Sequence, residues 1–200
     1  MKNIIAKSFT TILIAMVTFL DAQTINRYGT TTANFLEIGI GSRATSMGDA
    51  YVAVANDVSS IYWNPAGLSH VTNSSALFSI QPWLVDIDMM FAGGAFVVPS
   101  VGVIGLGITH LDYGEMDVTN LEYQDGTGER FGASDVAATF TFSRKIVSWF
   151  SFGSSMKYIS SKIWHSSASA FAVDLGVLVN TNFFSFTGKD KDGLNIGMSI

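Results

Sequence analysis

The side chains best suited to catalysis or metal binding are the three histidines, His70, His110 and His165. None has a cysteine or second histidine at the spacing of a metal site, and a single histidine at a strand end is usually solvated or interfacial. A strand would place His110 and Asp112 on one face, where the carboxylate could orient the imidazole. No serine in a nucleophile motif accompanies them. The sequence therefore predicts no catalytic residue, no enzyme activity and no metal site.

Two further patterns resemble ligand-binding loops but lack the residues that complete them. Asp190, Asp192 and Asn195 surround Gly193 as calcium ligands would, yet the glutamate that closes such a loop is missing. The two glycines between Val103 and Thr109 are followed by neither the lysine nor the helix of a phosphate loop. We interpret the first pattern as a charged turn and the second as a strand that leaves room for a neighbouring segment. No cofactor is predicted.

Three charged residues, Asp135, Lys157 and Asp174, lie within segments of otherwise apolar or small residues. A turn at residues 145–147 would place Asp135 opposite Lys157, and a loop at residues 164–167 would place Asp174 opposite the same lysine. Because an unpaired interior charge is costly, we expect a structural ladder with one lysine between two carboxylates. The functional alternative is that these charges anchor a plug or a ligand carboxylate.

The segments that carry these charges have the lengths and the alternation of strands. The expected strands are residues 76–81, 86–98, 101–113, 135–144, 149–163 and 167–179, with a seventh in residues 193–200. The turn at residues 145–147 would also pair Phe142 with Phe150 and Phe140 with Phe152, as an outward aromatic cluster near a membrane interface. A soluble sandwich with one buried face would show the same alternation.

Composition favours a membrane protein built from strands. Hydrophobic residues make up 48% of the chain and charged residues only 14%. After the first residues, however, no apolar run is long enough for a helix to cross a bilayer. In a transmembrane barrel lipid-facing and lumen-facing residues alternate, which explains both facts. The net charge of −5 does not suit a nucleic-acid partner, and the lack of cysteine excludes a lipoprotein attachment site and disulfides.

The first 22 residues have the features of a secretory signal peptide. Lys2 and Lys7 precede an apolar run from Phe9 to Leu20, and Ala22 closes a cleavage site. A membrane anchor is the alternative, but the run is shorter than the roughly 20 residues that span a bilayer. We predict that residues 1–22 are removed on export.

Residues 23–72 are predicted to form a plug segment with short helices. Within it, Met47, Tyr51 and Val54 share one helical face and should pack against wall residues. Asp57 and Asn64 are suited to capping two further turns, and a proline follows Asn64 at the first helical position. The alternative is an exposed linker.

Residues 73–200 would then be the first part of a barrel. The connections at residues 99–100 and 145–147 are short and residues 114–133 are long and polar, so the short turns should face the periplasm and the long loop the outside. Because a sheet that ends at a seventh strand would leave backbone groups unsatisfied in lipid, we expect an N-terminal fragment of a longer barrel.

Several of these segments resemble one family. Its most specific motifs here are Gly48-Asp49-Ala50 and Asn64-Pro65-Ala66-Gly67, and its strand motifs are Gly132–Asp135, Ser155–Ile159 and Ala172–Gly176. Together they resemble the PorV/PorQ branch of the FadL-like outer-membrane proteins; residues 141–144 depart from it, because they read TFSR where the group has Tyr-Ala-Arg. The resemblance implies an all-β fold: a transmembrane antiparallel β-barrel of about fourteen strands when complete, with an N-terminal helical plug and about seven strands present here.

The resemblance also implies two functional alternatives in the bacterial outer membrane, with membrane lipid around the barrel. A PorV-like protein would assist a type IX secretion system, with secreted cargo signal domains and other secretion-system subunits as partners. A FadL-like channel would instead take up hydrophobic small molecules past its plug. The branch motifs favour the first alternative.

Overall fold

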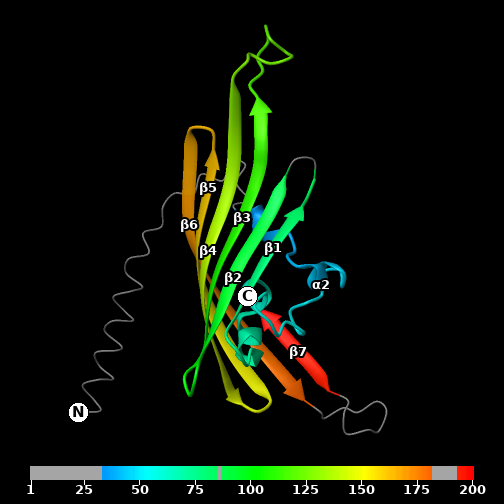
Figure 1. Cartoon of the computed structure of the whole chain (residues 1–200), viewed down its shortest axis with the longest axis vertical. Helices are drawn as coiled ribbons and strands as arrows, with labels where there is room; N and C mark the ends of the chain where they lie inside the picture. The colour runs from blue at the N-terminus through cyan, green and yellow to red at the C-terminus, as the bar shows by residue number, and fades with distance from the viewer. Residues whose placement is uncertain (1–32, 85–86, 182–192) are drawn as a thin grey trace, which may run out of the picture. The chain divides into compact units, whose positions relative to one another are not determined.

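The computed structural model describes residues 33–84, 87–181 and 193–200 (Figure 1). Its main element is a seven-stranded antiparallel sheet in which each strand pairs with its neighbour in the sequence. The sheet curls into a half-barrel. The strands are β1 (Ser75–Pro82), β2 (Asp88–Val98), β3 (Gly102–Asp117), β4 (Arg130–Val147), β5 (Phe150–Ile163), β6 (Ser166–Thr181) and β7 (Leu194–Ser199).

Each of the seven expected strands overlaps an observed one. The largest difference lies in β3 and β4, which continue into the polar segment that was expected to be a loop. There Arg130 Nε lies 3.0 Å from a carboxylate oxygen of Asp117, and Arg130 Nη1 lies 3.2 Å from one of Glu115. These cross-strand ion pairs lie on exposed positions, where apolar alternation gives no signal.

The predicted register between β4 and β5 is wrong. β4 continues through residues 145–147, with an irregularity there, and the turn is at Ser148 and Trp149. Phe142 is therefore opposite Ser154, and Phe140 is opposite Met156, in place of the predicted phenylalanine pairs. Because the partner is displaced by an even number of residues, every side chain keeps its predicted face.

The turn between β5 and β6 is also tighter than expected. It contains only Trp164 and His165, and Trp164 adopts a left-handed conformation with φ of 50°. This short turn lies at the same end of the sheet as the long β3–β4 connection. The proposed sorting of short and long connections to opposite ends therefore does not hold at this turn.

Four short helices precede the sheet: η1 (Asn34–Glu37), α2 (Ser42–Thr45), α3 (Ser60–Trp63) and η2 (Pro65–His70). Element η2 contacts β3, β4, β5 and β6. The face of the sheet that these helices cover is called the inner face below, and the opposite face the outer face. Among the described residues, no helix is long and apolar enough to cross a membrane. The predicted signal peptide and Asp190 and Asp192 lie outside the described residues.

Candidate functional site

Large side chains such as Phe91 and Leu111 are buried on part of the inner face, but where η2 contacts β3 to β6 the inner face consists mainly of small side chains. These residues are Gly105, Gly107, Ala137, Thr139, Thr141, Ser143, Ser151, Gly153, Ser155 and Gly176. The threonines and serines among them are buried, and Thr141 and Ser155 share a hydrogen bond of 2.8 Å between their hydroxyls. Small side chains let the helical segment approach the strands closely, so the inner face is shaped to hold that segment.

Asn64 connects the helical segment to the sheet. Its side chain is fully buried, and its Nδ2 donates to the carbonyls of Val52 and Val177 at 2.9 and 3.2 Å. Its Oδ1 accepts from the N–H of Ala66 at 3.1 Å, so it is the predicted N-cap of η2, with Pro65 at the first helical position. One amide thus satisfies backbone groups of a loop, a helix and strand β6.

Two glycines of the sheet make room for this cap. Gly153 and Gly176 are directly opposite each other on β5 and β6. A Cβ atom at Gly153 would lie 2.3 Å from the carbonyl carbon of Pro65, and one at Gly176 would lie 2.3 Å from Oδ1 of Asn64. Ser143 on β4 donates a hydrogen bond of 3.1 Å to the carbonyl of Ala66. The Asn64–Gly67 motif is therefore seated on three adjacent strands.

The part of the inner face that holds the Asn64–Gly67 motif is apolar at β3. Ile61 and Leu68 are buried, and a Cβ at Gly105 would lie within 3.0 Å of both side chains. Gly67 cannot carry a side chain either, because its Cβ would lie 2.3 Å from the carbonyl oxygen of Ala55. The prediction that this segment packs against the wall as short helices is confirmed at α3 and η2.

The Gly48-Asp49-Ala50 motif has a different place. Gly48 and Asp49 both have positive φ, 62° and 64°, and form an exposed turn that ends α2. Because the helix ends there, the expected helical face does not continue. Met47 is 44% exposed, so its predicted packing against the wall is wrong. Tyr51 is buried and Val54 partly buried, but both pack with Trp63 in a cluster within the helical segment and not, as predicted, against strand residues.

The predicted charge ladder forms only in part. Lys157 Nζ lies 2.6 Å from a carboxylate oxygen of Asp174. The pair is diagonal, because Lys157 is opposite Ala172 on β6. Asp135 does not take part, because it is opposite Ser161 and instead accepts a hydrogen bond of 2.7 Å from the hydroxyl of Tyr113. The four-residue displacement between β4 and β5 separates it from the lysine.

Sequence reasoning missed Tyr62, which links this ion pair to the helices. Lys157 Nζ lies 6.0 Å from the centre of the Tyr62 ring, at the limit of a cation–π contact. The Tyr62 hydroxyl lies 2.6 and 2.8 Å from the carbonyl oxygens of Leu36 and Ile38, and can donate to either. Burial raises the pKa of Tyr62, and the negative charges of Asp49 and Glu37 raise it further. The tyrosine therefore stays protonated and keeps this donor.

The three histidines lie far apart in the chain, but His110 on β3 and His165 in the β5–β6 turn line the same polar cavity. His70, at the end of η2, has its Nε2 3.1 Å from Oδ1 of Asn180 on β6, and Nδ2 of Asn180 donates to Asn195 on β7. His110 lies on the outer face of β3, and His165 stacks on the ring of Trp164. In the part of the chain that the structure describes, no three histidine, aspartate or glutamate side chains are grouped to hold a metal.

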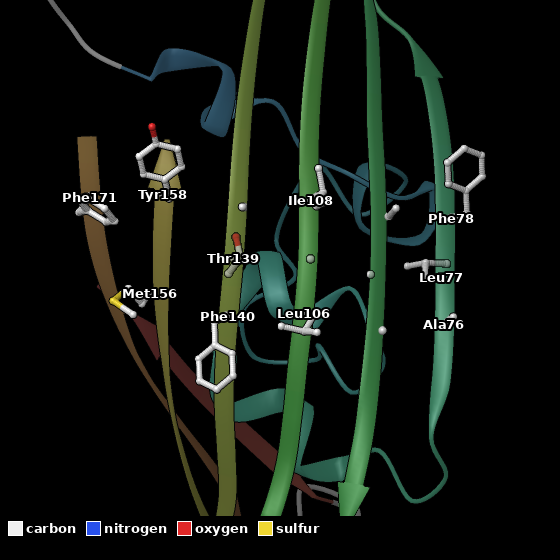
Figure 2. Close-up of a pocket in the computed structure, with 15 residues that line it drawn as sticks. Ala76, Leu77, Phe78, Leu106, Ile108, Thr139, Phe140, Met156, Tyr158 and Phe171 are labelled. Atoms are coloured by element: carbon white, nitrogen blue, oxygen red, sulfur yellow. The ribbon is translucent and has the colours of Figure 1, made fainter. Parts of the chain in front are cut away.

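The outer face is apolar and exposed, and Figure 2 shows several of its side chains with short helices behind the strands. Its exposed side chains include Phe78, Ile80, Phe96, Leu106, Ile108, Phe140, Met156, Tyr158, Phe171, Val173 and Leu175. A groove of about 810 Å³ runs among them across β1 to β6. On this face, Asp88, Arg130, Arg144 and Lys162 lie toward the ends of their strands, and Glu115 and Asp117 lie at the end of β3 beside Arg130, whereas His110 and Asp112 lie within β3. The sequence showed the apolar alternation but not the groove.

Comparison with models of known protein families found no family that matches this chain. No curated protein matches it either.

Proposed function

We propose that this chain is an outer-membrane β-barrel protein of the PorV/PorQ type that assists protein export or surface delivery by a type IX secretion system. The seven described strands would form part of the barrel wall, and the helices from η1 to η2 its plug. The family and the secretion role rest on the sequence resemblance. The membrane location rests in addition on the outer face.

The outer face of β4 is the observation that carries the membrane proposal. Its apolar positions, from Val136 to Phe142, lie between Ser134 and Arg144. Ten residues of strand extend about 33 Å, and a tilt of about 40° reduces this to a height of about 25 Å. The hydrophobic band of outer-membrane barrels is about 25 Å tall. The spacing of polar residues on this strand therefore suits a bilayer.

The fixed plug supports a carrier or docking role over an open pore. Asn64 donates to the backbone of β6, and glycines of β5 and β6 fit closely around its neighbour Pro65. A plug held by buried hydrogen bonds costs free energy to move, because each donor or acceptor must find a new partner. Cargo delivery at the membrane surface does not require the plug to leave.

Uptake of hydrophobic small molecules by a FadL-like channel is the second candidate. It is favoured by the apolar contact between plug and wall, where Ile61, Leu68 and Phe91 are buried together. A ligand path along this contact would require these side chains to separate. The Lys157–Asp174 ion pair on the same face has no evident role in such a path.

A gene deletion in the source bacterium, complemented with the full chain, tests the proposal. We expect the protein in the outer-membrane fraction, and we expect the deletion to reduce surface display of proteins that carry type IX C-terminal signals. Normal display together with reduced uptake of labelled long-chain fatty acid would favour the second candidate. A protein found in the soluble periplasmic fraction would contradict both.

A further inference from the structure

We propose that the outer face holds one zwitterionic phospholipid of the phosphatidylethanolamine class, with an acyl chain along β4 and the headgroup between Asp112 and Lys162. This inference rests on the proposed membrane location but not on the secretion role. It starts from two cavities on the outer side of the same strands, one apolar and one polar.

The apolar cavity is formed where large and small side chains alternate on the outer face. One row of paired residues crosses six strands and alternates in size at its start: Phe78, Ala92, Ile108, Ala138, Tyr158 and Phe171. The small side chain of Ala138 therefore leaves a trough over β4, between Ile108 of β3 and Tyr158 of β5, which are labelled in Figure 2. The trough is lined mainly by carbon. The next outward residues of β4 toward the long-loop end, Val136 and Ser134, are smaller than the residues opposite them on β3, His110 and Asp112, so a hydrocarbon chain can extend from the trough along β4.

The polar cavity continues the same three strands toward the long-loop end. Two positions beyond Ile108 comes His110, and the next outward row is Asp112 on β3, Ser134 on β4 and Lys162 on β5. These four residues line a cavity of about 630 Å³, together with Trp164 among others. An aromatic ring at this level is typical of the membrane interface.

The charges of this row point to a zwitterion. Neither Asp112 nor Lys162 forms an ion pair within the described residues. One oxygen of Asp112 accepts from the N–H of Gly114 at 3.0 Å, which fixes the carboxylate. The two residues are two strands apart, so their backbones are separated by about 10 Å. A phosphate near Lys162 and an ammonium near Asp112 would neutralise both charges.

A polyanionic lipid fits this site less well. Asp112 and Glu129 line the cavity with Lys162 and Arg130, and Arg130 already pairs with Asp117 and Glu115. Among the described residues that line this cavity, a headgroup with several phosphates would meet one lysine or arginine outside an ion pair, Lys162, and the carboxylates of Asp112 and Glu129. A lipid that lacks the ammonium would leave the Asp112 carboxylate facing a phosphate, with no positive charge to neutralise it.

Native mass spectrometry of the full chain in detergent, with equimolar lipids added, tests this site. The probes are phosphatidylethanolamine, phosphatidylglycerol and phosphatidylcholine with identical acyl chains. We expect one phosphatidylethanolamine to be retained about tenfold better than either other lipid. Asp112→Asn should abolish the preference over phosphatidylglycerol, Lys162→Gln should weaken retention of all three, and Ala138→Phe should do the same by filling the trough.

Two matched variants control for general effects. Arg144→Gln removes an outward charge at the other end of β4, and Val173→Phe adds an outward ring on β6 beyond the trough; both should retain lipid like the parent. Equal retention of the three lipids by the parent protein would overturn the proposal, as would tighter binding of phosphatidylglycerol. Flotation with vesicles reports separately on membrane insertion, so a protein that fails to float contradicts the proposed function, whatever lipid it binds.

Discussion

The two faces of β4 differ in the size and burial of their side chains. On β4 the inner residues Ala137, Thr139 and Thr141 are small and buried, whereas the outer residue Phe140 is large and 47% exposed. A water-soluble protein would place its large apolar side chains in the core and its small polar ones outside. On β4 this arrangement is reversed, which fits a wall that faces lipid outside and a closely packed plug inside.

On β4 size separates the two faces more clearly than polarity, whereas on β2 and β3 large apolar side chains such as Phe91 and Leu111 are buried on the inner face. Both faces contain glycine: Gly176 is inward and Gly94 is outward. A Cβ at Gly176 would overlap Asn64, whereas one at Gly94 would meet only the Phe96 ring at an ordinary distance of 3.5 Å. Glycine is thus required where a backbone approaches, and tolerated elsewhere.

Gly176→Ala should give the largest effect. The added methyl has no room beside Asn64 and Pro65, so we expect the free energy of unfolding to fall by about 3 kcal/mol, at the upper end for an overpacked site. Urea titration of the refolded protein in lipid vesicles measures it. The matched variant Gly94→Ala should change stability by less than about 0.5 kcal/mol, as surface substitutions do. If the two alanine variants lost equal free energy of unfolding, the close packing of Asn64 and Pro65 against β6 would be refuted.

Phe140→Arg tests the outer face. At the middle of a bilayer an outward arginine costs about 2 to 3 kcal/mol, and the cost decreases toward the interface. We therefore expect a smaller loss for Phe152→Arg, because Phe152 is opposite Arg144 near the strand end. Unfolding in vesicles measures both variants. If neither arginine lowers stability, the outer face does not meet lipid and the soluble sandwich becomes the better interpretation.

Much of this architecture could be predicted from the sequence, because the period-two pattern marks strands and their faces. The alternation around Phe140 gave the correct face even though its predicted partner was wrong, since an even displacement preserves the face. Register itself depends on turn geometry. The pattern at Lys145 to Val147 gave no sign that β4 continues through an irregularity, and that error removed Asp135 from the ladder.

The site was predictable only where a local rule applied. Asn64 and Pro65 formed a recognisable cap, and the structure places that cap as expected. Tyr62 could not be found, because its partners Leu36 and Ile38 offer backbone carbonyls, which every residue has. For the same reason, the sequence could not predict that Asn64 donates to the carbonyl of Val177 on β6.

Asn64→Ala should destabilise the inner contact without adding volume. It removes the N-cap of η2 and leaves the partly buried carbonyls of Val52 and Val177 without this donor. We expect a loss of about 2 kcal/mol, since a cap and an unsatisfied buried group each cost about 1 kcal/mol or more. Limited proteolysis should then cut the plug segment faster than in the parent. An exposed asparagine, Asn120→Ala, is the control and should leave cleavage of the plug unchanged.

Lys157→Met should have the smallest effect and tests whether the remaining ion pair is structural. The lysine and aspartate side chains are 12% and 21% exposed, so water screens the charge that Asp174 retains, and we expect a loss of about 1 kcal/mol. Adding Asp174→Asn removes that charge and should restore most of the stability, as a double-mutant cycle in vesicles can show. Lys145→Met, on the same face of the sheet but exposed and outside any ion pair among the described residues, should change little. If the double variant is less stable than Lys157→Met alone, Asp174 has a further partner and the pair does not act as a structural unit.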